Sequence, residues 1–198
     1  MIFLARFLSF LFHPVIFFLI MPFMVVYRQT SDPSYAFKWA FFSAVFIFLG
    51  GFLFLLGRIK GVFSDDDISK REERYRFYFI LYFLVFVYFV ASFFFKGVFF
   101  PLSIIVFGVL FGVLVFDIVN KYSLKASVHV GVACAFITSI SIFYGITAFF
   151  VSFWLIPLIF WARIKLKKHT LKEGIAGGFI GIFVALFTFF LGKYLYLG

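Results

Sequence analysis

The chain has 198 residues, of which 65% are apolar and only 13% are charged. A soluble domain has about 45–50% apolar and about 25% charged residues, so the charges here are too few to cover a soluble core of this size. The composition excludes most classes of soluble protein and predicts that lipid surrounds most of the chain. The formal net charge is +10, and in a membrane protein we expect it to face lipid phosphates or to orient the chain across the bilayer.

Apolar segments of helical length recur along the whole chain. A membrane-spanning helix needs about 20 apolar residues, and seven segments approach or reach that length: 3–27, 36–57, 77–95, 98–119, 128–145, 147–162 and 174–196. We interpret the first as a retained span interrupted by Pro14 and Pro22, with His13 in a structural role at this helix distortion, and we expect Pro157 to kink the sixth. The sequence predicts an all-α fold, a polytopic transmembrane helical bundle of six to seven spans that forms a single domain over residues 1–198.

The polar breaks between these segments differ in charge. The second, fourth and sixth breaks, residues 58–76, 120–127 and 163–173, hold nearly all of the charged side chains. Seven spans place these three breaks on one side of the membrane together with the N-terminus. That side carries 14 of the Lys and Arg residues and the other side carries 4. Because Lys and Arg are enriched in cytoplasmic loops, we expect the chain to lie in the cell membrane with its polar face on the cytoplasmic side.

The break at 163–173 carries the first candidate catalytic group. Arg163 is followed by His169 and then by Glu173, near the expected start of the last helix. A carboxylate can hold the proton on one imidazole nitrogen and leave the other as a nucleophile or base, while an arginine binds a tetrahedral anion through two hydrogen bonds. Thr170 and Glu173 also match a helix-capping box, which fixes a helix start without chemistry. Both roles stay open for Glu173, and they can coexist.

Two further segments add cations and a second imidazole. Residues 125–129 hold Lys125, Ser127 and His129, and a second imidazole can protonate a leaving group. Residues 70–76 hold four cations: Lys70, Arg71, Arg74 and Arg76. Together the three segments predict an anion-binding site with no metal ligands and no cofactor. Such a site suits phosphoryl transfer, in which positioning and charge neutralisation do most of the work.

These motifs resemble the signatures of the type 2 phosphatidic acid phosphatase superfamily, in the family's order over residues 70–173. Arg163, His169 and Glu173 have the spacing of its third signature (Arg, five residues, His, three residues, Asp), with Glu in place of Asp. Ser127-Val128-His129 is similar to its second signature, Pro-Ser-Gly-His, without the Pro and the Gly. The cations of residues 70–76 are similar to its first signature, Lys-x6-Arg-Pro, in an altered form.

The resemblance implies an integral membrane lipid phosphatase that works without a metal ion. His169 would attack phosphorus and become phosphohistidine, Glu173 would orient it, and His129 would protonate the leaving group. The phosphate oxygens would be held by Arg163, Lys70, Arg74 and Ser127, with Lys125 beside them, and the choice among the four cations of residues 70–76 stays open. The substrate would be an amphiphile such as a polyprenyl diphosphate, phosphatidate or phosphatidylglycerol phosphate.

The sequence also bears on lipid binding, transport and nucleic-acid binding as other functions. The missing Pro and Gly beside His129 fit a catalytically degenerate family member that binds or moves phospholipids. A transporter or channel should show charges along a path through the membrane or inverted repeats, and the sequence has neither. The expected partners are a lipid phosphate substrate and membrane phospholipids. Nucleic acid is not expected, because the basic residues are split among membrane-bounded loops, and the oligomeric state stays open.

Overall fold

The structure is a computed structural model, and it describes residues 1–65, 68, 70–92, 94, 100–122 and 124–197. The regular secondary structure of these ranges is helical, as predicted. The helices are α1 (Ile2–Leu11), α2 (Pro14–Thr30), α3 (Pro33–Ile59), α4 (Arg71–Ser92), α5 (Phe100–Tyr122), α6 (Val128–Tyr144), α7 (Ile146–Ser152), α8 (Leu155–Lys165) and α9 (Leu171–Leu197).

Six apolar stretches in the described part of the chain are long enough to cross a bilayer. They are Ile2–Thr30, Pro33–Ile59, Glu72–Ser92, Leu102–Tyr122, Ile146–Lys165 and Leu171–Leu195. The helix α6 is apolar but shorter, with 17 residues. Each of the seven predicted spans therefore corresponds to one helix or one pair of helices, and the chain is an integral multi-pass membrane protein.

The first predicted span is two helices, α1 and α2, separated at Phe12 and His13. Pro14 is the first residue of α2, a position where the missing N–H costs no helical hydrogen bond. His13 is the N-cap of α2, and its Nδ1 accepts a hydrogen bond from the amide of Val15 at 3.4 Å. The break therefore places His13 at a helix terminus rather than inside a continuous span.

The sixth predicted span is also two helices, α7 and α8, which are separated at Phe153 and Trp154. The sequence predicts a kink at Pro157, and the break lies four residues earlier. A proline has no N–H and clashes with the carbonyl four positions before it, here that of Phe153. That carbonyl instead accepts a hydrogen bond from the amide of Ile156 at 3.1 Å. The kink is thus displaced towards the N-terminus because the proline acts on the preceding turn.

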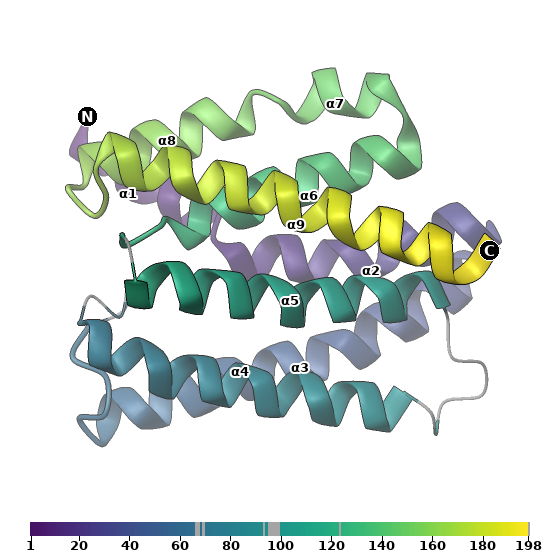
Figure 1. Cartoon of the computed structure of the whole chain (residues 1–198), viewed down its shortest axis with the longest axis horizontal. Helices are drawn as coiled ribbons and strands as arrows, with labels where there is room; N and C mark the ends of the chain where they lie inside the picture. The colour runs from purple at the N-terminus through teal and green to yellow at the C-terminus, as the bar shows by residue number, and fades with distance from the viewer. Residues whose placement is uncertain (66–67, 69, 93, 95–99, 123, 198) are drawn as a thin grey trace.

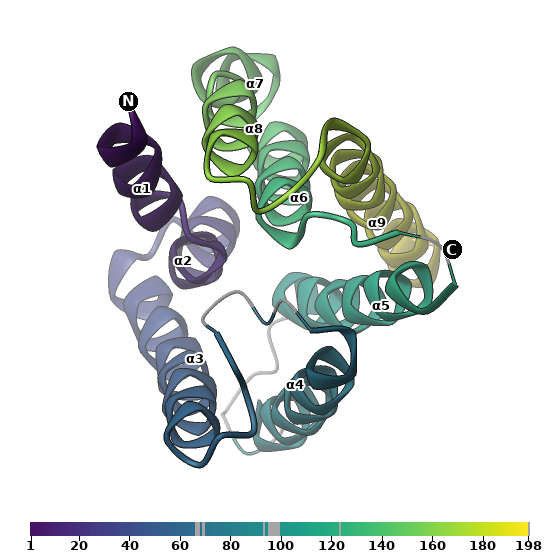
Figure 2. The ribbon, with the colours of Figure 1, turned by 90° about the vertical axis from the view of Figure 1, so that its left-hand side faces the viewer.

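The long helices run side by side along one axis, and the chain reverses direction at each end (Figure 1). One end holds the N-terminus, the end of α3 and start of α4, the end of α5 and start of α6, and the end of α8 and start of α9. Figure 2 looks onto this end, with α2 and α6 towards the middle of the bundle. The predicted convergence of the three polar breaks is confirmed, and we call this end of the bundle the polar end.

Glycines allow α6 and α9 to approach closely at the polar end. A Cβ on Gly177 would overlap the carbonyl oxygen of Ser127, and a Cβ on Gly181 would overlap that of Gly131. At this separation the amide of Ser127 donates a hydrogen bond to the carbonyl of Glu173 at 2.9 Å. The glycines therefore join the start of α6 to the start of α9, which are the two segments that carry the candidate imidazoles.

Candidate active site at the polar end

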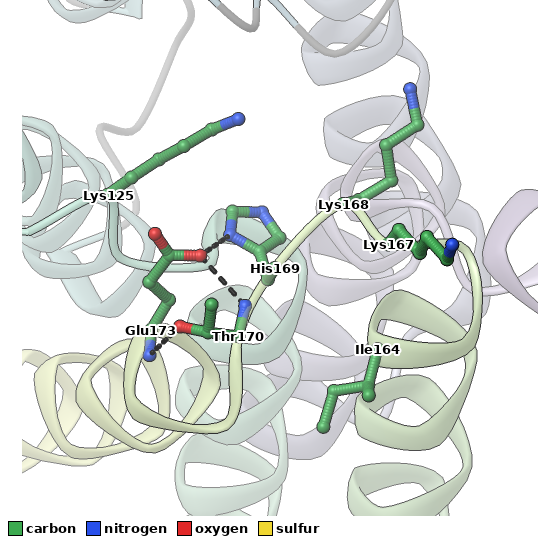
Figure 3. Close-up of a pocket in the computed structure, with 7 residues that line it drawn as sticks. All are labelled: Lys125, Ile164, Lys167, Lys168, His169, Thr170 and Glu173. Atoms are coloured by element: carbon green, nitrogen blue, oxygen red, sulfur yellow. Dashed lines mark hydrogen bonds and ion pairs between the residues drawn. The ribbon is translucent and has the colours of Figure 1, made fainter.

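The carboxylate of Glu173, in the first turn of α9, serves two neighbours. Its Oε2 accepts a hydrogen bond from the amide of Thr170 at 2.9 Å, and the Thr170 hydroxyl accepts one from the amide of Glu173 at 3.3 Å. These two bonds form a capping box. The same Oε2 lies 3.3 Å from Nδ1 of His169 (Figure 3). One carboxylate thus caps the helix and contacts the candidate nucleophile, so the two roles left open by the sequence are compatible.

His169 lies between α8 and α9, and its side chain is 6% exposed. Burial and then the positive charges of Arg163 and Lys125 lower the pKa of His169 to about 4, although Glu173 acts in the opposite direction. The imidazole is therefore neutral at pH 7, and its contact with Glu173 is a hydrogen bond rather than an ion pair. We assign the proton to Nδ1 because this nitrogen faces the carboxylate, which leaves the lone pair on Nε2.

An open pocket of about 390 Å³ surrounds this imidazole. The described residues that line it are Lys125, Ile164, Lys167, Lys168, His169, Thr170 and Glu173. Figure 3 shows Nε2 of His169 turned away from Glu173, on the side on which the side chains of Lys125 and Lys168 extend. Three lysines around a neutral imidazole attract an anion, and Nε2 faces the space in which that anion would lie.

Arg163, in the last turn of α8, is 4% exposed and is not among the described residues that line this pocket. Its Nη1 donates a hydrogen bond to the hydroxyl of Ser9 in α1 at 2.9 Å. Its charge also acts on His169 and disfavours the protonated ring. Arg163 therefore acts on His169 through its charge and is held by Ser9 of α1, while its predicted contact with phosphate stays a prediction.

Ser127 and His129 lie at the start of α6. Ser127 is the N-cap and is fully buried, but its hydroxyl makes no capping bond and has no hydrogen-bond partner among the described residues. The ring of His129 meets the ring of His13 edge to face, with ring centroids 5.0 Å apart. Ser127 is tied to Glu173 through the backbone. The second imidazole therefore lies at the polar end, although neither side chain is among the described residues that line the pocket.

Arg74 makes structural contacts at the polar end. It is 7% exposed, and it donates hydrogen bonds to the carbonyl of Ile68 at 2.9 Å and to Oδ1 of Asn120 at 2.8 Å. These bonds connect the start of α4 to the end of α5. The guanidinium is thus engaged away from the described lining of the pocket, where the sequence predicts that it contacts phosphate.

Lys70 is also at the polar end but outside the pocket. Its side chain is 64% exposed, and its Nζ lies 3.5 Å from Oε1 of Glu73. Arg76 is exposed as well, and the side chain of Arg71 lies outside the described residues. Of the predicted site residues, the structure brings Lys125, His169 and Glu173 into one pocket, while Lys70 and Arg74 lie elsewhere on the same end.

Two contacts from the first span were not predicted from the sequence. Ser9 holds Arg163, and His13, for which the sequence suggests only a structural role, packs against His129. Ser9 lies in α1 and His13 lies in the break that follows it, so helical periodicity does not relate the two. Two polar residues within one predicted apolar span are the signal that could have pointed to the site.

No family model, curated protein or solved structure matches this chain. The resemblance to the lipid phosphatases therefore rests on the residues quoted above. The support for a function comes from the geometry around His169.

Proposed function

We propose that the chain is an integral membrane lipid phosphatase of the type 2 phosphatidic acid phosphatase superfamily. It hydrolyses a phosphomonoester or a diphosphate on an amphiphilic substrate and passes through a phosphohistidine at His169. The observation that carries this proposal is the state of His169, a buried neutral ring with Nδ1 against Glu173 and Nε2 facing a pocket with three lysines. An imidazole held at one nitrogen by a carboxylate is an activated nucleophile at the other.

In the first step of the proposed reaction, Nε2 of His169 attacks the phosphorus atom. The bond from phosphorus to the leaving oxygen breaks as the P–N bond forms, and the protonated ring of His129 gives its proton to that oxygen. The lysines of the pocket hold the phosphoryl oxygens, with the charge of Arg163 behind them. Fixed cations of this kind stabilise the charge of the transferring group without rearrangement.

In the second step, water attacks the phosphohistidine. The P–N bond breaks, the new P–O bond forms, and the neutral ring of His129 takes the proton of the attacking water. Inorganic phosphate leaves, and both imidazoles return to their starting states. Glu173 keeps the proton on Nδ1 of His169 throughout, so that the same nitrogen lone pair is available in every cycle.

The position of the pocket favours a lipid substrate. It lies between the end of α8 and the start of α9, where two membrane-spanning stretches meet the polar end, and Ile164 is part of its lining. A phosphate can occupy the cationic pocket while its acyl or prenyl tail lies along the apolar helices. Polyprenyl diphosphate, phosphatidate and phosphatidylglycerol phosphate share this form. We further propose that the polar end faces the cytoplasm of the cell, because Lys and Arg concentrate there.

A second candidate function is lipid binding without hydrolysis. It is favoured by the position of His129, whose ring packs against His13 rather than lining the pocket, and by the Pro and Gly missing from the segment before it. A site with a nucleophile but a misplaced acid would hold a lipid phosphate in the cationic pocket and release it unchanged.

Phosphate release from purified protein in detergent separates the two functions. The substrates are the three lipids named above, with EDTA present throughout. We expect metal-independent release from at least one substrate and inhibition by vanadate. Replacing Lys125 by Ala should raise KM by about tenfold, because a charge-assisted contact is worth about 1.5 kcal/mol, and Lys193→Ala at the opposite end should not. Saturable lipid binding with no release from any substrate would favour the second function.

The two roles of Glu173 predict different outcomes for two substitutions. Glu173→Gln keeps a capping side chain but removes the charge that holds the proton on His169. We expect kcat to fall by about 10²-fold, by analogy with the loss of a carboxylate that orients a catalytic histidine, while the unfolding temperature changes little. Glu173→Ala should lower both, with about 1 kcal/mol lost from the missing cap. If Glu173→Gln has the wild-type kcat, the carboxylate is only a cap.

The lowered pKa of His169 predicts activity that persists into acid. Only the neutral ring attacks, and its pKa is lowered to about 4, so the His169 contribution to kcat/KM is lost only as the pH falls through that value. Lys125→Met removes one of the cations that lower this pKa, so the acid limb of the pH profile should move to higher pH. The ionisation of the substrate is the same in both proteins. Superimposable acid limbs for the two proteins would contradict the assignment.

A further inference from the structure

We infer that His13, in the break between α1 and α2, is a positioning residue that holds the ring of His129 in place. This inference rests on the proposed function, in which His129 protonates the leaving oxygen. It adds to the site a residue that lies outside all three segments resembling the phosphatase signatures. It also assigns a role to the break in the first span beyond the accommodation of Pro14.

The ring of His13 is held at the start of α2. Its Nδ1 accepts a hydrogen bond from the amide of Val15, as the N-cap of α2. A neutral imidazole has one nitrogen that accepts and one that donates, so the proton of His13 lies on Nε2. Protonating Nδ1 would remove the acceptor that caps α2. This bond therefore fixes the orientation of the His13 ring at the start of α2.

The rings of His13 and His129 pack against each other. The centroids of His13 and His129 are 5.0 Å apart, and the ring planes are 89° to each other. In such an arrangement the positive edge of one ring meets the negative face of the other. The ring of His13 therefore limits the orientations that are open to the ring of His129, the proposed general acid.

The pair of His13 and His129 is connected to the rest of the site. Ser9, in α1 and four residues before His13, accepts a hydrogen bond from Arg163 at 2.9 Å. His129 lies two residues after Ser127, whose amide binds the carbonyl of Glu173. The segment from Ser9 to His13 thus contacts one proposed site residue in α8 and another in α6. The break between α1 and α2 fixes both from the same side.

Two substitutions separate the ring of His13 from its capping role. His13→Asn keeps an acceptor that caps α2 but removes the ring, and His13→Phe keeps a ring but removes the acceptor. With an alkyl lipid phosphate we expect His13→Asn to lower kcat by about tenfold or more, with KM within about twofold, because a small displacement of a catalytic group is costly. We expect His13→Phe, which keeps a ring at this position, to have a kcat much closer to that of the wild type than to that of His13→Asn. Asp32→Ala, which removes the cap of α3 at the opposite end, is the control for the loss of a cap.

A second substrate tests whether the effect passes through the general acid. An aryl phosphate has a leaving group that departs without a proton, so the formation of phosphohistidine from it does not depend on His129, which acts only in the second reaction step. In a single turnover we expect His13→Asn to phosphorylate His169 from the aryl phosphate within about twofold of the wild-type rate, which also shows that the variant is folded, and to do so from the alkyl phosphate about tenfold or more slowly. Equal loss on both substrates, or a wild-type kcat with the alkyl phosphate, would overturn the inference while leaving the phosphatase intact. A wild-type protein that releases no phosphate from either substrate would overturn both.

Discussion

Replacing His169 by alanine is expected to abolish phosphate release, with kcat lowered by at least about 10³-fold. The reason is chemical, because the substitution removes the imidazole, and the other nitrogen-bearing side chains among the described residues that line the pocket are lysines. The lysines stay in place, so a lipid phosphate should still bind, and its affinity should change little. The measurement is phosphate release by the purified variant, together with lipid binding by the same preparation.

The stability of this variant provides its control. Thr170 and Glu173 still form the capping box of α9 without His169, and the ring makes one hydrogen bond that is lost. We therefore expect the unfolding temperature in detergent to fall by no more than about 4 °C, which corresponds to about 1 kcal/mol for a chain of this size. A variant that is as stable as the wild type and also as active would show that His169 is not the nucleophile.

Replacing Gly177 by alanine is expected to damage both the fold and the site. The new Cβ would overlap the backbone carbonyl oxygen of Ser127, and a backbone atom cannot move aside as a flexible side chain can. We expect a loss of about 3 kcal/mol in the free energy of unfolding, the upper part of the range for overpacking. The helices α6 and α9 must separate, which breaks the 2.9 Å bond between Ser127 and Glu173, and activity should fall by at least about tenfold.

The neighbouring glycine is a matched control for this effect. A Cβ on Gly178 would lie 3.5 Å from Sγ of Cys134 and 3.7 Å from Val130, both ordinary contact distances. Gly178→Ala should therefore have nearly wild-type stability and activity. Thermal unfolding and phosphate release of the two variants are compared side by side. If Gly177→Ala and Gly178→Ala behave alike, the close approach of α6 and α9 does not position the site.

The helices and their arrangement could be predicted largely from the sequence. In lipid every backbone polar group must be bonded internally, so long apolar segments have to be helices, and each span carries the chain across the membrane, so alternate breaks lie at the same end. The predicted bounds were least accurate at 77–95, because α4 begins at Arg71. Its first turn is polar and carries Glu72 and Glu73, and a helix that leaves the apolar layer does not end there.

Local parts of the site could be predicted, and distant contacts could not. His169 and Glu173 are four positions apart, so the start of a helix brings them together. Arg163 and Ser9 are 154 positions apart, and nothing in either segment specifies the other. The sequence places Arg74 among four similar cations but does not show that Asn120 binds it. The direction in which a buried arginine points depends on tertiary packing, which a sequence motif does not specify.

The most direct test of nucleophilic attack by His169 is to trap the covalent intermediate. The purified protein is mixed with a lipid phosphate that carries labelled phosphorus and is quenched in alkali, in which phosphohistidine survives. The peptides are then separated and the labelled one is sequenced by mass spectrometry. We predict label on His169 in the wild type and none in the His169→Ala variant. Label on any other residue, or phosphate release by a protein that never acquires label at His169, would contradict it.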